Sequence, residues 1–257
     1  MRKLFIIFCI TTISFNCFAE SVYTYDLPKD IILGSVSLGI TVSSLFIKRS
    51  ANAVSENDIL SRGNINAFDR SLMFEYNKPI DIFSDITVYA LIATPVLSLA
   101  GNFKDASAWV TYSVMYGESL LFVFGTAEFL KNTILRYRPY NYFGDVPAGK
   151  ESDYFKSFPS RHTAFAFMSA GFITSTFFAE YPGSPWKVPL CAAAYTLAAG
   201  VGISRIFSGN HFASDVLAGV AIGSLYGYLI PRLHLRKKHD GISLVPLTNG
   251  FLVSLEL

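Results

Sequence analysis

The sequence has little charge and little cysteine for its length. Of its 257 residues only 16% are charged, and the formal net charge is +2. A nucleic-acid partner is therefore not indicated, because proteins that bind nucleic acid usually carry a strongly basic surface. Cys9 and Cys17 lie in the first 19 residues, so removal of that segment would leave Cys191 alone, with no intramolecular disulfide. Cysteine usage therefore does not identify the redox compartment.

Apolar residues are abundant. Hydrophobic residues make up 51% of the chain and aromatic residues 15%, and the mean hydropathy is +0.39. This is too apolar for an ordinary soluble domain and indicates a membrane protein with one helical unit. Beyond residue 20, the apolar runs are Ile31 to Ile47, Ile82 to Leu99, Ala106 to Leu130, Thr163 to Phe178, Val188 to Ile203 and Val216 to Ile230. We therefore predict an all-α, multi-helix membrane bundle.

Residues 1–19 have the pattern of a secretory signal peptide. Arg2 and Lys3 are basic, Leu4 to Phe15 is apolar, and Cys17 to Ala19 is a plausible cleavage site. The alternative is an uncleaved first transmembrane helix, for which the apolar run is short.

A polar break between the last two apolar runs contains a candidate catalytic pair. His211 and Asp215 are four residues apart, so on a helix they would lie on one face. A carboxylate that hydrogen-bonds one imidazole nitrogen leaves the other free as a nucleophile or base. Arg205, at the end of the preceding run, would bring a guanidinium to an anion on that histidine. An isolated pair of this kind more often caps a helix, so the pair alone does not establish chemistry.

Two earlier stretches strengthen the catalytic interpretation. Lys131 and Arg138 are seven residues apart, which is two helical turns, so both cations would point the same way before Pro139 ends the helix. Phe158 to Thr163 is a polar cluster at the start of another apolar run. Basic residues at helix ends often only anchor a helix at the membrane interface. Anchoring does not account for the histidines and the aspartate.

Three motifs follow one another along the chain: Lys131-x6-Arg138-Pro139, Pro159-Ser160-Arg161-His162 and Ser204-Arg205-x5-His211-x3-Asp215. In order and context they resemble the signature of the type 2 phosphatidic acid phosphatase (PAP2) superfamily, which also contains bacterial class A acid phosphatases and vanadium haloperoxidases. The resemblance covers roughly residues 85 to 231. It departs at Arg161, where the family usually has a glycine that offers its backbone N–H to the phosphate. Arg161 keeps an N–H but lacks the conformational freedom of glycine.

The resemblance implies a mechanism. His211, oriented by Asp215, would attack phosphorus and form a phosphohistidine. His162 would protonate the leaving oxygen and then activate water. It implies neither a metal nor a cofactor. The residues expected to bind the phosphate are Lys131, Arg138, Ser160, Arg161 and Arg205; Ser160 is also a candidate helix N-cap.

Other polar residues have expected structural roles. Glu118 would be a buried hydrogen-bond partner, and Glu128 would pair with Lys131. We expect Arg136 to be a lipid-headgroup anchor. The pattern of residues 64–74 predicts an amphipathic helix on the membrane surface, in which Asp69 and Arg70 form a solvated ion pair.

The expected organisation has four regions. A signal peptide (1–19) precedes an apolar and interfacial segment (20–84), the PAP2-like catalytic domain (85–238) and a C-terminal β-hairpin (239–257). If the motifs lie outside the membrane and the basic cluster of residues 232–238 lies inside, counting the helices backwards places the start of the Ile31 run in the cytoplasm. A cleaved signal would start it outside. Either the leader is handled differently, or the Ile31 run lies along the membrane, or the helices form a compact unit that does not span as counted; of these we expect a non-spanning Ile31 run.

The function expected from these observations is hydrolysis of a lipid phosphomonoester or diphosphate at the outer, periplasmic face of a bacterial inner membrane. The expected partners are a lipid phosphate substrate and the membrane. A secreted acid phosphatase acting on soluble esters, a vanadate-dependent haloperoxidase and a non-enzymatic membrane protein or transporter are the alternatives.

Overall fold

The computed structural model describes residues 21–47, 60–102, 106–144, 147–148, 153–236, 242–247 and 250–255. The predicted signal segment, residues 1–19, lies outside the described residues. In chain order the elements are α1 (Leu27–Phe46), η2 (Arg62–Asn64), α2 (Ala67–Ser71), α3 (Lys78–Asn102), α4 (Ala106–Thr133), η3 (Pro139–Phe143), α5 (Arg161–Glu180), α6 (Lys187–Phe207), α7 (Ala213–Leu233), β1 (Ile242–Leu247) and β2 (Gly250–Leu255).

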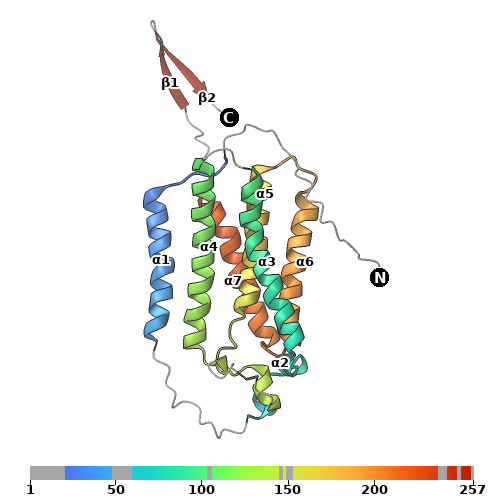
Figure 1. Cartoon of the computed structure of the whole chain (residues 1–257). Coiled ribbons are helices and arrows are strands. Elements are labelled where there is room, and N and C mark those ends of the chain that lie inside the picture. The colour runs from blue at the N-terminus through green and yellow to red at the C-terminus, as the bar shows by residue number, and fades with distance from the viewer. Residues whose placement is uncertain are drawn as a thin grey trace, which may run out of the picture.

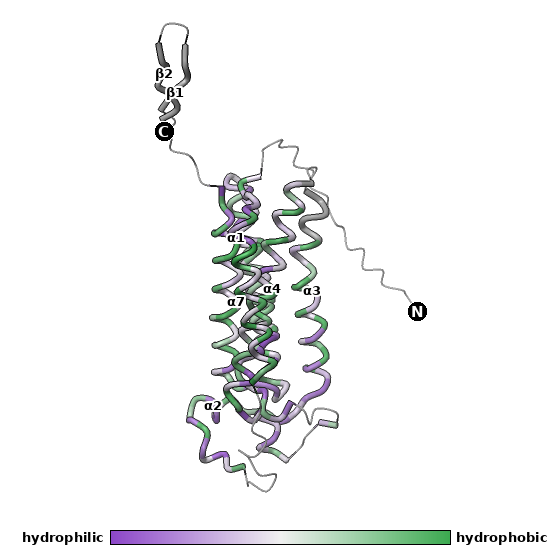
Figure 2. Tube along the Cα trace, turned by 90° about the vertical axis from the view of Figure 1, so that its left-hand side faces the viewer, coloured by the Kyte–Doolittle hydropathy of each residue, from purple (hydrophilic) through white to green (hydrophobic). Residues whose placement is uncertain are grey.

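The long helices α1 and α3 to α7 stand side by side in one bundle, and the short helix α2 lies at one end of it (Figure 1). We call this the α2 end. Hydrophobic residues run along the helices, and many hydrophilic residues gather near α2 (Figure 2). Among the described residues, four helical segments are long and apolar enough to cross a membrane: Leu27–Phe46, Lys78–Val96, Lys187–Phe207 and Ala213–Leu233. The predicted all-α membrane bundle is confirmed.

Helices α5 and α7 approach each other closely because α7 carries a stripe of glycines. A Cβ atom on Gly223 would lie 2.1 Å from the Ala164 carbonyl oxygen, and one on Gly227 would lie 2.3 Å from that of Met168. Side chains at these positions would therefore push the two backbones apart. This close packing fixes the start of α5 against the start of α7, where a Cβ atom on Gly219 would lie 2.5 Å from the Ser160 carbonyl oxygen.

The expected non-spanning Ile31 run is not supported: α1 stands against α4 in the bundle (Figure 1), and it is one of the four segments long and apolar enough to cross a membrane. Asn132 of α4 donates through Nδ2 to the Ser44 carbonyl at 3.0 Å. At the opposite end of the bundle, the Arg236 N–H donates to the Val22 carbonyl at 2.8 Å. The chain therefore enters α1 and leaves α7 at the same end, away from α2.

The stretch after α4 also differs from expectation. The seven-residue spacing of Lys131 and Arg138 predicted one continuous helix, but α4 ends at Thr133. The residue before a proline disfavours helical backbone angles, and Arg138, which precedes Pro139, is extended. Its N–H donates to the Tyr154 carbonyl at 3.0 Å, so the extended stretch pairs with a later part of the chain.

The C-terminal hairpin is present. Strands β1 and β2 pair antiparallel, with Leu247 opposite Gly250 and Ile242 opposite Leu255. The expected boundary at residue 84 falls inside α3, which runs without interruption from Lys78 to Asn102.

Candidate active site

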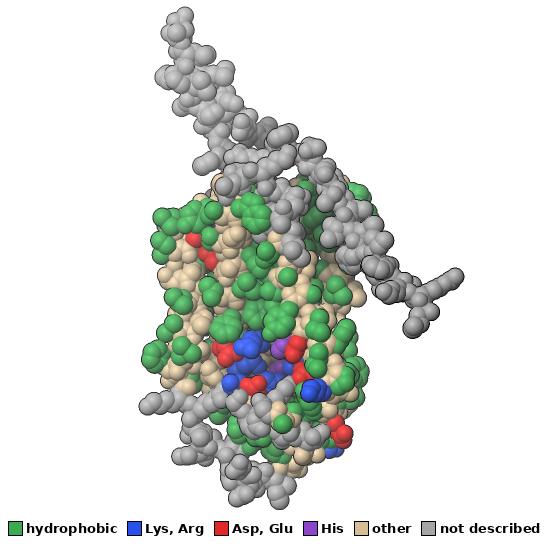
Figure 3. All heavy atoms as spheres, viewed as in Figure 1, with side chains coloured by type: hydrophobic (Ala, Val, Ile, Leu, Met, Phe, Trp, Pro, Cys, Tyr) green, Lys and Arg blue, Asp and Glu red, His purple; other side chains and the backbone are tan. Residues whose placement is uncertain are grey.

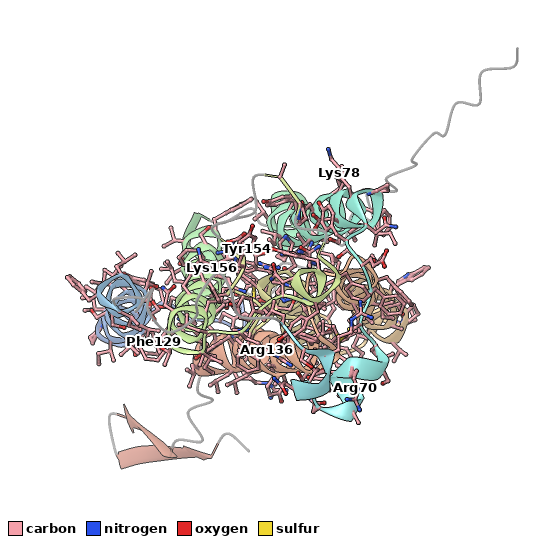
Figure 4. All side chains as sticks on the ribbon, turned by 90° about the horizontal axis from the view of Figure 1, so that it is seen from below. Arg70, Lys78, Phe129, Arg136, Tyr154 and Lys156 are labelled. Atoms are coloured by element: carbon pink, nitrogen blue, oxygen red, sulfur yellow. The ribbon has the colours of Figure 1, made fainter. Side chains whose placement is uncertain are left out.

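A polar cavity of about 110 Å³ lies toward the α2 end of the bundle. Figure 3 shows Lys and Arg side chains gathered there with a histidine and acidic groups, below an otherwise hydrophobic face. In Figure 4, which looks onto this end, Arg136, Tyr154 and Lys156 come from the inner segments, whereas Arg70 and Lys78 lie toward the margin. The residues that line the cavity are Asp81, Asp85, Lys131, Arg138, Asp153, Arg161, His162, Arg205, Asn210 and His211.

His211 lies in the short turn between α6 and α7 and is 1% exposed. Gly209 shapes this turn: its φ is +69°, and a Cβ there would lie 2.5 Å from the Glu75 carbonyl oxygen. The Nδ1 atom of His211 is 2.6 Å from the backbone carbonyl of Ser157. A carbonyl only accepts, so Nδ1 carries the hydrogen and Nε2 keeps its lone pair. Nε2 lies 3.3 Å from Nη1 of Arg138.

Asp215 does not hydrogen-bond His211 as expected, since its Oδ2 lies 3.8 Å from Nδ1 of that histidine. Oδ2 instead accepts from the hydroxyl of Ser157 at 2.5 Å and from the backbone N–H of Phe212 at 2.9 Å. Ser157 thus contacts Asp215 through its side chain and His211 through its carbonyl. Asp215 is connected to the imidazole through Ser157 and through the helix start that carries both residues.

His162 lies in the first turn of α5, and its partner is a residue that the sequence analysis missed. Nε2 of His162 is 2.9 Å from Oδ1 of Asp85, which comes from α3. Asp81, one turn earlier on α3, also lines the cavity. The sequence did contain a signal for this partner: Asp81 and Asp85 are four residues apart at the start of an apolar run. Two aspartates at such a place are energetically costly unless they face a polar site.

Arg205 lies in the last turn of α6 and is 3% exposed. Its Nη1 atom pairs with Oδ1 of Asp81 and donates to the Ser84 hydroxyl at 2.8 Å. Its Nε atom has no hydrogen-bond partner among the described residues. The side chain is held from α3 and retains a donor.

The other two predicted cations reach the cavity from α4 and from the extended stretch after it. Lys131, 4% exposed, donates to the Lys156 carbonyl at 2.7 Å. Arg138 donates through Nε to the Asp153 carbonyl at 3.0 Å and through Nη1 to the Asn210 carbonyl at 3.1 Å. Backbone carbonyls therefore fix the direction of both cationic side chains.

Ser160 and Arg161 begin α5. Ser160 is fully buried and caps the helix, with its hydroxyl 2.8 Å from that of Thr163; it does not line the cavity. Arg161 lines the cavity and forms an ion pair with Glu128. Glu128 thus pairs with Arg161, whereas the sequence led us to expect a pair with Lys131.

Arg136 is not a lipid-headgroup anchor. Its Nη2 lies 2.6 Å from Oδ2 of Asp69, and its Nη1 pairs with Oδ1 of Asp215. Asp69 is fully buried in the five-residue helix α2 and accepts from the Ser214 N–H at 2.9 Å. The predicted solvated Asp69–Arg70 pair is therefore wrong. Asp69 and Arg136 instead brace the start of α7, which carries Asp215.

The charges around the cavity favour an anion. Burial lowers the pKa of His211 well below its ordinary value, and the positive charges of Arg138 and Lys131 act in the same direction. The imidazole is therefore neutral at neutral pH, the form that can attack phosphorus. The charged side chains that line the cavity are the cations Lys131, Arg138, Arg161 and Arg205 and the acids Asp81, Asp85 and Asp153.

Comparisons with known proteins agree with the motifs. A family model described as the PAP2 superfamily matches residues 112–239. A lipid A 1-phosphatase of Porphyromonas gingivalis is 49% identical over 74 residues, which are 28% of this chain and 15% of that protein. A probable diacylglycerol pyrophosphate phosphatase 1 of Schizosaccharomyces pombe is 31% identical over 85 residues, 31% of this chain and 30% of that protein. A bacitracin transport permease protein of Bacillus licheniformis is 39% identical over 89 residues, 35% of this chain and 39% of that protein.

The matches therefore span between 15% and 39% of the length of these relatives. The crystal structure of a transmembrane PAP2-type phosphatidylglycerolphosphate phosphatase from Bacillus subtilis aligns with 80% of this chain and 95% of that chain, at 25% identity and a TM-score of 0.44. The segment matched by the family model contains Lys131, His162 and His211, one residue from each of the three motifs. The chain belongs to the PAP2 superfamily.

Proposed function

We propose that this protein hydrolyses a phosphomonoester or diphosphate on a lipid head group through a phosphohistidine intermediate. The observation that carries the proposal is the orientation of His211. Its Nδ1 hydrogen is donated to the Ser157 carbonyl, and its Nε2 lone pair faces Arg138 at the cation-lined cavity. A neutral, oriented imidazole beside an anion site has the requirements of a nucleophile for phosphoryl transfer.

In the first step Nε2 of His211 attacks phosphorus, and the bond from phosphorus to the leaving oxygen breaks. His162 donates a proton to that oxygen, which leaves as the lipid alcohol or the shortened lipid phosphate. In the second step His162 removes a proton from water, which attacks phosphorus and breaks the bond to His211. Inorganic phosphate leaves, and both histidines return to their starting state.

The cationic side chains stabilise the negative charge on the transferring group. Arg138 and Lys131 are held by backbone carbonyls, and Arg205 is held by α3, so all three are oriented before the substrate arrives. Such preorganisation lowers the barrier because the donors do not reorganise during the reaction. Arg161, where the family usually has glycine, would add a guanidinium contact, while Glu128 holds it beside the cavity.

A lipid substrate fits the location of the cavity. Apolar side chains cover the bundle surface beside it (Figure 3), as expected for helices surrounded by lipid tails. The cavity lies toward one end of the bundle, where the phosphate of a lipid head group would meet the cations. Two of the relatives, a lipid A 1-phosphatase and a probable diacylglycerol pyrophosphate phosphatase, support this substrate class by their names.

We further propose that the α2 end faces the periplasm. Arg232 and Arg236 lie at the opposite end, and basic residues favour the cytoplasmic side. Because α1 starts at that same end, the chain before it would be cytoplasmic. A cleaved secretory signal and a periplasmic site therefore exclude each other in this topology, and we propose that residues 1–19 are retained.

The test of function is phosphate release by protein purified in detergent. The panel contains phosphatidic acid, phosphatidylglycerol phosphate, a polyprenyl diphosphate, lipid A and the soluble ester p-nitrophenyl phosphate. Release from a lipid is expected for the wild type and for Arg70→Ala, an exposed control at the same end, and not for His211→Ala. An acid-labile, alkali-stable phosphoryl adduct on His211 after rapid quenching would identify the intermediate.

Other outcomes would replace the proposal. Release from the soluble ester alone would favour an acid phosphatase of the same family. Halide oxidation that requires vanadate would favour a haloperoxidase. Activity that survives His211→Ala would refute the nucleophile assignment.

Orientation has its own test. A green fluorescent protein fused after Leu257 is expected to fluoresce, because the proposed orientation places it in the cytoplasm. The intact mass of the purified protein is expected to include residues 1–19. Loss of those residues, or a non-fluorescent fusion with full phosphatase activity, would contradict the proposed orientation.

A further inference from the structure

A second polar cluster lies inside the bundle, away from the cavity. It consists of Asp30 in the first turn of α1, Glu118 in the middle of α4 and His234 directly after α7. Glu118 precedes Lys131 by 13 residues, which corresponds to about 20 Å along a helix at 1.5 Å per residue. All three side chains are buried, with exposed fractions of 8%, 5% and 0%.

The hydrogen bonds of His234 define the chemistry of this cluster. Its Nδ1 lies 2.9 Å from the Ile230 carbonyl, which can only accept, so Nδ1 carries a hydrogen. In a neutral imidazole Nε2 then has a lone pair. Nε2 lies 2.9 Å from Oδ1 of Asp30 and 3.5 Å from Oε2 of Glu118. Two carboxylates and one imidazole lone pair therefore converge on the same point.

The nearby charges do not balance this arrangement. Lys29 lies 3.6 Å from Oδ1 of Asp30, but its ammonium is at the edge of the cluster and also donates to the Leu233 carbonyl. Neither oxygen of Glu118 has a hydrogen-bond partner among the described residues. A buried carboxylate without such partners is strongly unfavourable unless a cation or a proton neutralises it.

We propose that Asp30, Glu118 and His234 bind one divalent transition-metal cation, Zn²⁺ or Mn²⁺. One imidazole nitrogen and two carboxylate oxygens form a ligand set that both ions accept. The three ligand atoms lie within 4.8 Å of one another, so small side-chain rotations bring each to the 2.0–2.2 Å that such ions require. The bond from Nδ1 of His234 to a backbone carbonyl is the usual support of a metal-ligating histidine.

The ion would stabilise the fold and take no part in phosphoryl transfer. It would join α1, α4 and the end of α7, and α1 otherwise contacts the bundle mainly through α4. The proposal is independent of the phosphatase mechanism, because the histidines of the cavity belong to the α2 end.

The test is the metal content of protein purified in detergent without a polyhistidine tag. Mass spectrometry of the elements is expected to find about one Zn²⁺ or Mn²⁺ per chain in the wild type. EDTA is expected to lower the melting temperature, and ZnCl₂ or MnCl₂ to restore it. Glu118→Gln keeps the side-chain volume and removes the charge, so it is expected to weaken metal binding at least tenfold. His162→Ala, which removes an imidazole from the cavity, is the matched control and is expected to retain the ion.

Three results would overturn the proposal. The first is a wild-type protein with no ion and a melting temperature unaffected by added metal, which would mean that a proton neutralises the cluster. The second is an ion lost in His162→Ala but kept in Glu118→Gln, which would assign it to the cavity. The third is an equal affinity for the metal ion in Glu118→Gln and His162→Ala. If Glu118→Gln does not fold, the wild-type metal content and melting temperature still decide. Phosphate release from intact, chelated protein reports separately on the phosphatase proposal.

Discussion

Ser157 donates its hydroxyl to Asp215 at 2.5 Å and accepts the Nδ1 hydrogen of His211 on its backbone carbonyl at 2.6 Å. The carboxylate therefore acts on the imidazole through an intervening residue. A backbone carbonyl fixes the tautomer as well as a carboxylate does, but it carries no charge and stabilises an imidazolium less. The neutral histidine, which is the nucleophile, is the form that this arrangement favours.

Substitution of Asp215 should therefore reduce the rate without abolishing it. Asp215→Asn retains hydrogen-bonding capacity but loses the ion pair with Arg136 and weakens the bond to Ser157. We expect kcat to fall about 10- to 100-fold, the usual size of an effect through a supporting residue, with KM little changed. Steady-state kinetics beside His211→Ala measure this. A loss as complete as that of His211→Ala would mean that Asp215 contacts the imidazole directly during the reaction.

Asp85 should act as a positioning residue for His162. Burial lowers the pKa of His162 to about 4, and the Asp85 carboxylate, 2.9 Å from Nε2, acts in the opposite direction because it favours the imidazolium that donates the proton. In Asp85→Asn we expect kcat to fall about tenfold, within the range of general acid–base effects, and the alkaline limb of its pH profile to move to lower pH. Asp153→Asn, which changes another carboxylate that lines the cavity, is the control and should leave that limb in place. An unmoved limb in Asp85→Asn would show that the pair is only structural.

The pH dependence should reflect His211. Because burial and nearby cations hold its pKa well below the ordinary value of about 6.5, it stays neutral as the pH falls through 6.5. We therefore expect no acid limb near pH 6.5 attributable to this residue in kcat/KM. The unfolded chain takes up a proton below about pH 6.5 and the folded chain does not, so folded-state stability falls as the pH drops below that value. Thermal melting from pH 7.5 to 5 should show a shallower decline in His211→Asn than in the wild type. Equal slopes would contradict the depressed pKa.

Much of the fold could be predicted from the sequence because membrane helices show as long apolar runs. The residues of the three motifs were brought together as predicted from their order: His162, His211, Lys131, Arg138 and Arg205 line one cavity. The catalytic roles of these residues remain predictions.

What the sequence did not reveal depends on contacts between distant segments. The hydrogen bond of Asp85 to His162 spans 77 positions, and no local pattern connects α3 to the start of α5. Helical spacing suggested that Arg136 points to lipid, but the chain leaves the helix at Thr133 and pairs with residues 154–157. Arg136 consequently reaches Asp69 and Asp215. The guanidinium carbon of Arg136 also lies 4.2 Å from the centroid of the Phe212 ring, a cation–π contact that holds the side chain in this position.

The close approach of α5 and α7 leads to a prediction about stability. Gly223→Ala would place a Cβ atom 2.1 Å from the Ala164 carbonyl oxygen, and that backbone atom cannot rotate away. The helices must separate, and overpacking of this kind typically costs about 1–3 kcal/mol, so the melting temperature should fall. Ser160 and His162 begin the displaced helix, so we also expect kcat to decrease. Gly200→Ala in α6 is the matched control, since a Cβ there meets nothing within 4 Å and alanine favours the helix. Melting of the two variants in the same detergent compares them directly. If Gly223→Ala melted as high as Gly200→Ala, the α5–α7 contact would be able to relax, and it would not be what holds the start of α5 against α7.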